Sequence, residues 1–375
     1  MAVQNEKELY KWLCLINTPK LPHREIIDLI KTTKSLDAAL HSIEENNSPH
    51  LTTLKKDLNN PSLKKVELCL HWLNGAANRY ALPFTDQNYP VLLREISVPP
   101  LLLFVEGNLD FLKTPQLAIV GSRNATPIGQ EIAYRMASQA ATAGLTITSG
   151  LARGIDGFAH RGALTAKGKT IGVTATGLDR IYPVSHSKLF EQMRLVGAIV
   201  SEFIPTTPPL AAYFPQRNRI ISGLSLGTLV VEASLRSGSL VTARFALEQG
   251  REVFAIPGSL YNPLAQGCHA LVKQGAILVE TLQDILLALP DGLKSVQIAN
   301  VPINKVQSEK ATVSMADNLL NVLNCVDYSP TPFDIILQRS ALLGTEVNHA
   351  LLILELEGQV ALLAGGYTRI AVEKA

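Results

Sequence analysis

Paired cysteines and long apolar runs are both missing from this 375-residue sequence. The four cysteines (Cys14, Cys69, Cys268 and Cys325) are far apart and show no Cys-x-x-Cys spacing, so we expect neither a disulfide framework nor a zinc site. No run of about 18 apolar residues occurs, and the first residues do not form a basic-then-apolar leader. These absences predict a soluble, cytoplasmic protein that does not enter the membrane.

Two nucleotide-binding motifs are missing as well. No Gly-x-x-x-x-Gly-Lys-Ser/Thr sequence occurs, which argues against a P-loop ATPase. The segment from Gly121 to Gly129 lacks the Gly-x-Gly-x-x-Gly spacing of dinucleotide folds, and Arg123 stands where the second glycine would admit a pyrophosphate. No cluster of His, Cys or carboxylate residues has the spacing of metal ligands. We therefore expect no metal, no cofactor and no enzymatic activity.

The net charge of +2 conceals an uneven distribution of charge. From Gly121 to Arg251 the sequence has 11 Arg and 3 Lys against 2 Asp and 5 Glu, a net charge of +7, so the remaining residues together carry −5. The excess is mostly arginine, which suits bidentate contact with phosphate and stacking on flat rings. A polyanionic ligand of this segment is indicated.

Apolar segments alternate with segments of helical periodicity through the middle of the chain. The apolar segments lie near residues 101–105, 117–120, 145–148, 170–174, 198–201, 227–231, 252–256 and 276–279. Apolar strands separated by helices are typical of a parallel sheet covered on both faces. We predict the α/β class, with an extended Rossmann-like, doubly wound and mostly parallel sheet over residues 79–289, whose ligands lie beyond the carboxyl ends of the strands.

Helical domains are predicted on both sides of this sheet. Residues 1–78 have helical apolar spacing and predict a SAM-like or helix-hairpin-helix-like domain. Because Lys20–His23 lacks the glycine of a DNA-binding hairpin, a packing or protein-contact role is favoured over direct contact with DNA. Residues 290–313 are polar and irregular, as in a linker. Residues 314–375 show three helices and a hairpin, a winged-helix-like pattern. Its expected recognition segment, Gly344–Leu354, has no Arg or Lys, so protein docking is at least as plausible as duplex recognition.

Three glycine-containing loops follow apolar strands. In the first, Gly121 and Ser122 form a turn before a helix that Thr126 caps and Pro127 begins, an arrangement that leaves backbone N–H groups for an anion. The second runs from Ser149 to Asp156, and the third from Ser237 to Ser239 opens another helix. Three such loops at the strand ends of one sheet predict a continuous anion track.

Two further clusters could contribute chemistry. Asp156 and His160 would share one helix face, but no nucleophile or metal ligand accompanies them, so we expect Asp156 to orient Arg153 or the loop backbone. Phe214 stands close to Arg217 and Arg219, and an aromatic ring beside arginines is suited to stacking a base above its phosphate. On a helix Arg217 and Arg219 point to different sides, which predicts that one of them faces the ligand.

These segments together resemble the DprA/Smf family of DNA-processing proteins of natural transformation. The matching segments are Ala118–Thr126, Ser149–His160, Gly177–Pro183, Phe214–Gly223, Val231–Ser239 and Phe254–Ser259. The chain departs from the family at Tyr182–His186, where relatives often have Tyr-Pro-x-Glu-Asn, and at Gly267–His269, where they often have Gly-Thr-Asn. The first departure affects a possible phosphate contact after Pro183, and the second lies near an expected dimer surface at Leu271 and Ile277.

The resemblance implies a homodimer that binds and protects single-stranded DNA without sequence preference and helps to load the recombinase RecA. The residues expected to bind DNA are Gly121, Ser122, Arg123, Gly150, Arg153, Gly154, Lys169, Phe214, Arg217, Asn218, Arg219, Ser237, Gly238 and Ser239.

Two other classes of protein are compatible with parts of the sequence. An enzyme of the phosphoribohydrolase type would need a carboxylate at the sugar, for which Glu232 is the candidate. A purely structural adaptor would leave the arginine excess unexplained.

Overall fold

The computed structural model describes residues 6–18, 23–45, 62–289 and 315–370. The N-terminal part is helical, as predicted. It consists of α1 (Glu6–Ile16), α2 (His23–Thr33), α3 (Leu36–Glu45) and α5 (Leu63–Asn74). Trp72 of α5 meets the ring of Phe104 edge to face, with the ring centroids 5.9 Å apart, and so attaches these helices to the sheet. Most of the Lys20–His23 hairpin lies outside the described residues.

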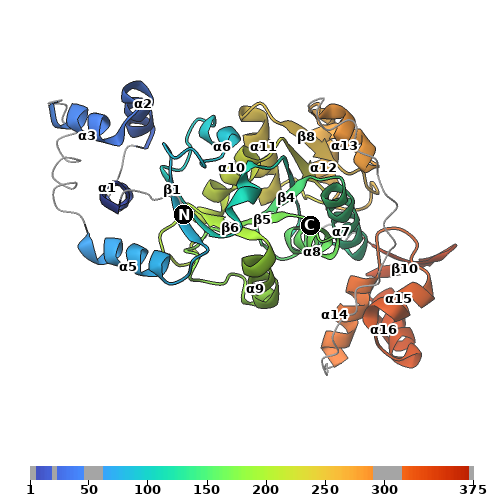
Figure 1. Cartoon of the computed structure of the whole chain (residues 1–375). Coiled ribbons are helices and arrows are strands. Elements are labelled where there is room, and N and C mark those ends of the chain that lie inside the picture. The colour runs from blue at the N-terminus through green and yellow to red at the C-terminus, as the bar shows by residue number, and fades with distance from the viewer. Residues whose placement is uncertain (1–5, 19–22, 46–61, 290–314, 371–375) are drawn as a thin grey trace.

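Within the described residues, nine strands form one sheet in the order β1-β2-β6-β5-β4-β3-β7-β8-β9 (Figure 1). The strands from β3 onwards are parallel, whereas β2 runs antiparallel to both β1 and β6. The bounds are β1 (Arg79–Pro83), β2 (Leu102–Gly107), β3 (Gln116–Val120), β4 (Thr146–Ser149), β5 (Thr170–Val173), β6 (Ala198–Ser201), β7 (Gly227–Val230), β8 (Glu252–Ala255) and β9 (Ile277–Leu278). The eight predicted strands are confirmed, and β1 is an additional one.

Helices cover both faces of the sheet because side chains alternate along each strand. Leu117 and Ile119 of β3 share a core with α7, α8 and α13, whereas Ala118 and Val120 of the same strand share the other core with α9 to α12. The helices are α7 (Pro127–Thr142), α8 (Ile155–Thr165), α9 (Ser187–Val196), α10 (Tyr213–Leu224), α11 (Gly238–Glu248), α12 (Gln266–Lys273) and α13 (Leu282–Ala288). Short helical segments are α6 (Val91–Arg94), η1 (Leu109–Lys113) and η2 (Val184–His186). The mostly parallel α/β architecture is therefore confirmed.

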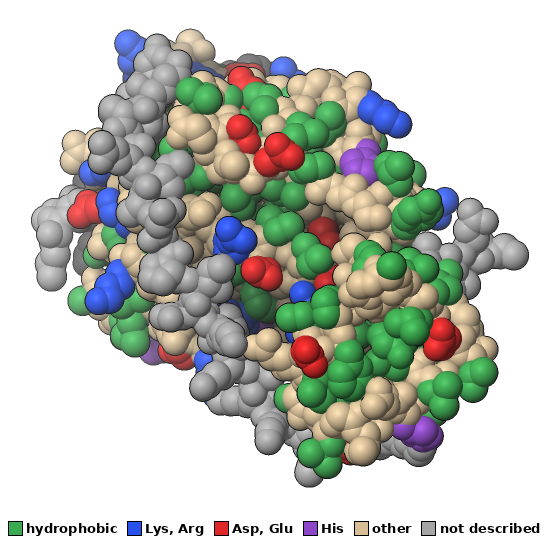
Figure 2. Space-filling model, turned by 90° about the vertical axis from the view of Figure 1, so that its right-hand side faces the viewer, with side chains coloured by type: hydrophobic (Ala, Val, Ile, Leu, Met, Phe, Trp, Pro, Cys, Tyr) green, Lys and Arg blue, Asp and Glu red, His purple; other side chains and the backbone are tan. Residues whose placement is uncertain are grey.

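The C-terminal part has a small core of its own. It consists of α14 (Met315–Cys325), α15 (Phe333–Ser340), α16 (Gly344–Leu356), β10 (Val360–Leu363) and β11 (Gly366–Arg369), the three helices and hairpin that the sequence predicts. Val322, Ile336 and Leu351 are buried in it. The predicted linker, residues 290–313, lies outside the described residues. Exposed apolar side chains gather on this domain (Figure 2), among them Leu343, Leu352, Leu356, Leu362 and Leu363.

All four cysteines are buried free thiols, and burial raises the pKa of Cys69 and of Cys268 to about 12. None of the described helices combines the length and hydropathy needed to cross a bilayer.

Candidate nucleic-acid interface

A pocket of about 540 Å³ opens where the strand order of the sheet changes direction, beyond the carboxyl ends of β3 and β7. Ligands of open α/β sheets bind at such a switch point, because the loops of the two neighbouring strands diverge there. The loops after β3 and β7 and the start of α10 supply most of the lining. The predicted residues that line it are Gly121, Ser122, Arg123, Phe214, Arg217, Asn218, Ser237, Gly238 and Ser239.

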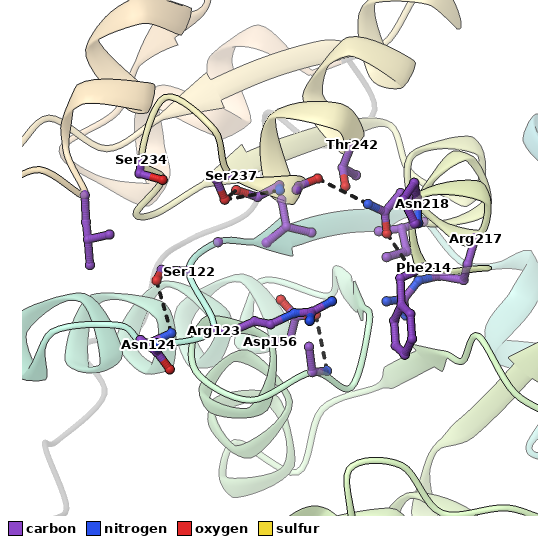
Figure 3. Close-up of a pocket in the computed structure, with 18 of the residues that line it drawn as sticks. Ser122, Arg123, Asn124, Asp156, Phe214, Arg217, Asn218, Ser234, Ser237 and Thr242 are labelled. Carbon is purple, nitrogen blue, oxygen red and sulfur yellow. Dashed lines mark hydrogen bonds between the residues drawn. The ribbon is translucent and has the colours of Figure 1, made fainter. Parts of the chain in front are cut away.

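Arg123 and Phe214 form the centre of this pocket. Arg123 is exposed on the loop between β3 and α7, and its guanidinium carbon lies 5.2 Å from the centroid of the Phe214 ring. Figure 3 shows Arg123 reaching across the pocket toward Phe214. The ring of Tyr182 also packs against Phe214, with the two ring centroids 5.4 Å apart. An exposed cation thus lies against an aromatic ring that is only partly buried.

The N-terminus of α7 does not have the role that the sequence predicts. Thr126 caps the helix as expected, since its hydroxyl accepts a hydrogen bond from the Gly129 amide at 3.0 Å. The buried carboxylate of Glu232, however, accepts hydrogen bonds from the Thr126 amide at 2.9 Å and from its hydroxyl at 2.6 Å. The helix end already holds an anion of the protein itself, so the prediction that it is open to phosphate is wrong.

Glu232 lies two residues after the end of β7, and β7 is the neighbour of β3 in the sheet. A Cβ on Gly129 would lie 2.4 Å from the Glu232 carboxyl carbon, so a glycine is needed at this position in the helix. Burial raises the pKa of Glu232. The carboxylate that a phosphoribohydrolase would need for catalysis therefore serves as a helix cap in this structure.

The second loop is held by Asp156. Its carboxylate accepts hydrogen bonds from the Gly150 amide at 3.1 Å and the Ala152 amide at 3.4 Å. The expectation that Asp156 orients the loop backbone is confirmed, and the prediction that Gly150 offers its amide to a phosphate is wrong. His160 is buried and pairs with the hydroxyl of Thr170 at 2.7 Å instead of with Asp156.

Burial raises the pKa of Asp156 to about 6, and the positive charge of Arg217 partly opposes this shift. Arg153 is exposed but does not line the pocket, and Gly154 lines a neighbouring hollow.

The third loop supplies the helix N-terminus that does face the pocket. Ser237 caps α11 by accepting a hydrogen bond from the Ser239 amide at 3.3 Å, and the first turn of the helix has no acidic residue. A Cβ on Gly238 would meet nothing within 4 Å, so the backbone is open to a ligand here. Asn218 of α10 donates to the Gly238 carbonyl at 3.2 Å and joins the two sides of the pocket.

Arg217 lines the floor of the pocket and is only 3% exposed. Its Nη1 donates to the carbonyl of Gly150 at 2.7 Å and to that of Val173, and its Nε donates to Asn218 at 3.2 Å. Burial lowers the pKa of Arg217 to about 10, which still leaves it cationic at neutral pH. It therefore supplies a fixed positive charge that is anchored to backbone carbonyls.

Two predicted site residues lie elsewhere. Arg219 makes a two-pronged ion pair with Glu202, with both contacts at 2.6 Å, and points away from the pocket, as its spacing from Arg217 requires. Lys169 precedes β5 at its amino end, which is the opposite end of the sheet, and lies 5.8 Å from the Phe111 ring centroid. Neither residue lines this pocket.

The two residues expected at a dimer surface, Leu271 and Ile277, lie in different environments. Leu271 on α12 is 6% exposed and belongs to the core, whereas Ile277 is partly buried on the edge strand β9.

Residues 81–290 match the family model described as DNA recombination-mediator protein A, and residues 307–366 match the DprA winged helix domain. Protein Smf of Escherichia coli K12 is 46% identical over 82% of this chain and 81% of its own length. DNA processing protein DprA of Streptococcus pneumoniae R6 is 48% identical over 54% of this chain and 71% of its own.

Two solved structures are similar. The X-ray structure of DprA from Streptococcus pneumoniae has a TM-score of 0.68 and 35% identity, and the match covers 76% of this chain and 99% of that one. A structure of DprA from Helicobacter pylori, described for its single-stranded DNA binding mode, has a TM-score of 0.51 and 30% identity over 55% of this chain and 93% of that one.

Proposed function

Because the chain belongs to the DNA recombination-mediator protein A family, also named DprA or Smf, we propose that it is a DNA-processing protein that holds single-stranded DNA in the pocket between β3 and β7. The names of the relatives describe DNA processing, and the Helicobacter pylori structure concerns single-stranded DNA. The role is that of a sequence-independent binder that protects incoming strands during natural transformation.

The contact of Arg123 with Phe214 carries this proposal. A phosphate needs a cation and a base needs a flat apolar surface, and here the two are within one nucleotide of each other. Base stacking on an aromatic ring contributes about 1–3 kcal/mol per base and tolerates any sequence. In a duplex the bases are already stacked on each other and cannot reach the ring, so single strands are favoured.

Charge around the pocket supports the same ligand. Arg123 and Arg217 are cationic, and Asp156 is the one carboxylate among the described residues that line the pocket. The N-terminus of α11 adds a partial positive charge. Phosphates would lie on the loops at Gly121 and Gly238, beside Arg123, with Asn218, Ser122, Ser237 and Ser239 as further donors, and Arg153 at the rim.

The further parts of the proposal concern partners and domains. We propose a homodimer through the edge strand β9 at Ile277, near which Leu278 is 46% exposed; Leu235, before α11, and Leu247, on α11, are also 60% and 53% exposed. Loading of a RecA-type recombinase onto the bound strand is the proposed outcome in the cytoplasm. The proposed domains are residues 1–78, 79–289 and 314–375, with a linker over 290–313.

Fluorescence anisotropy at two salt concentrations tests the binding function. We expect tight binding of single strands of any sequence, weaker binding of duplex and no detectable binding of mononucleotides. Protection by a mononucleotide against thermal unfolding, without an effect of oligonucleotides, would instead favour the phosphoribohydrolase alternative. The hydrogen bonds of Glu232 to Thr126 weigh against that alternative, since they place its carboxylate in a helix cap.

A further inference from the structure

A second hollow, of about 650 Å³, lies between the α/β domain and the C-terminal domain. Figure 2 looks onto this side of the molecule and shows a recess between the two domains. Arg123, Asn124 and Leu264 line both this hollow and the first pocket, so the two spaces adjoin along the loop that carries Arg123. A flexible ligand can pass from one to the other without leaving the protein surface.

The second hollow repeats the chemistry of the first. The C-terminal domain contributes Tyr328, which follows α14, and Arg369, at the end of β11. The guanidinium carbon of Arg369 lies 5.7 Å from the centroid of the Tyr328 ring, much as Arg123 lies against Phe214. Both side chains are only partly buried. Asn324, which is exposed, adds an amide.

The distribution of acidic groups distinguishes this hollow from its neighbour. No carboxylate occurs among the described residues that line it. A smaller hollow beside it, of about 80 Å³, is lined by Glu232 and Asp327, both buried. Because a polyanion is repelled by carboxylates, only the hollow with Arg369 suits it.

Positively charged side chains are scarce in the domain that contains Arg369. Residues 315–370 contain two cationic side chains, Arg339 and Arg369, against six acidic ones. Arg339 is bound to Asp327 and to the carbonyl of Cys325 inside the domain. The acidic C-terminal domain thus places its second arginine, Arg369, next to the proposed DNA pocket. Its helix α16 contains no arginine.

We propose that the hollow between the domains is a second site for the same single strand, in which Tyr328 stacks a base and Arg369 binds a phosphate. The proposal rests on the proposed function and extends it, since the C-terminal domain then lengthens the DNA track through its wing and the segment after α14. Recognition of duplex by α16 plays no part in this.

The test compares strand lengths. Oligothymidylates of roughly 4 to 20 nucleotides are titrated against the full-length protein, the double variant Tyr328→Ala/Arg369→Ala and the control Arg135→Ala, which removes an exposed arginine of α7 that lines neither space. We expect the shortest strands to bind all three equally. For long strands the double variant should lose roughly five- to 150-fold in affinity and about 0.7 in log–log salt slope.

The outcomes separate the two proposals. Wild-type affinity of the double variant at every length, together with weak binding by Arg123→Ala, overturns the second site and leaves the proposed function intact. Equal loss at every length, including the shortest, also overturns the second site. Wild-type affinity of Arg123→Ala overturns the proposed function itself.

Two additions keep the test informative if the double variant is poorly folded. Tyr328→Phe/Arg369→Lys keeps ring and charge and should restore most of the binding of long strands. In the wild-type protein, photo-crosslinking with 5-iodouracil strands should label the peptide that contains Tyr328 with long strands and the peptide that contains Phe214 with strands of every length. Absence of the Tyr328 label with long strands contradicts the proposal.

Discussion

The guanidinium of Arg123 lies over the ring of Phe214, 5.2 Å from its centroid, although the two residues are 91 positions apart in the sequence. The contact joins the loop after β3 to the start of α10 and thereby closes the pocket on one side (Figure 3). Ring and cation hold each other in place, so removal of either one should disturb the other.

Replacement of Arg123 by Ala should weaken the binding of all single strands alike. The reason is that a phosphate contact carries no sequence information, and its loss should reduce the log–log salt slope by about 0.7. Anisotropy titrations of several sequences at three salt concentrations measure both effects. Arg123→Lys should keep most of the slope, and Lys169→Ala, at the other end of the sheet, should match the wild type. An Arg123→Ala protein with normal affinity would contradict the site.

Replacement of Phe214 by Ala should cost about 1–3 kcal/mol of binding free energy through the loss of base stacking. Phe214→Leu keeps apolar packing against Tyr182 but offers no flat ring, so it should bind almost as weakly as Phe214→Ala. Binding of strands with abasic positions should be nearly the same in all three proteins. If Phe214→Ala discriminates between normal and abasic strands as strongly as the wild type does, the ring does not stack a base.

Binding should become tighter when the pH falls from 7 to 5. Burial raises the pKa of Asp156 to about 6, so acidification removes a negative charge from the pocket.

The raised pKa of Asp156 also makes the stability of the fold depend on pH. Since the folded pKa lies above the ordinary value of 3.8, the contribution of Asp156 to the free energy of unfolding is full below about pH 4 and is lost as the pH rises through 6.

The variant Asp156→Asn isolates this effect. It keeps an oxygen for the amides of Gly150 and Ala152 but cannot ionise, so its affinity for DNA should vary less between pH 5 and 7. His186 pairs with the Leu151 carbonyl of the second loop at 3.0 Å, and burial lowers the pKa of His186 and of His160, that of His160 to about 3. An unchanged pH dependence in Asp156→Asn would transfer the effect to His186.

Replacement of Glu232 by Ala should destabilise the fold by about 1–3 kcal/mol, because the Thr126 amide and hydroxyl lose a buried partner. Chemical denaturation measures the change, and Glu232→Gln should retain part of the stability. The wild type should release no base from nucleoside monophosphates in a chromatographic assay. Release of base by the wild type and its loss in Glu232→Gln would establish the enzymatic alternative.

The strands could be predicted because each one is an apolar run of the kind that a sheet buried on both faces requires. The exception, β1, begins with Arg79 and Tyr80, which are only partly buried, and so lacks a continuous apolar signal. The separation of Arg217 from Arg219 also followed from helical spacing. The local sequence pattern is sufficient to predict a feature that depends only on neighbouring residues, such as a strand or a helix face.

Contacts between distant segments could not be predicted in this way. Whether Glu232 reaches Thr126 depends on β7 lying beside β3, which is a matter of strand order. Arg219 faces a carboxylate and not the pocket because Glu202, 17 residues earlier in the sequence, lies beside it in the fold. The approach of Tyr328 and Arg369 to Arg123 depends on how two domains meet.

The Glu232 cap has a consequence for selectivity. Its carboxylate occupies the N-terminus of α7, so a phosphate or a mononucleotide cannot use that helix end, and only the N-terminus of α11 is left to it among the two. Single-stranded DNA can contact several loops at once, so it loses only a small part of its binding free energy when one helix end does not bind it. Under the proposed function, this arrangement favours long single strands over mononucleotides.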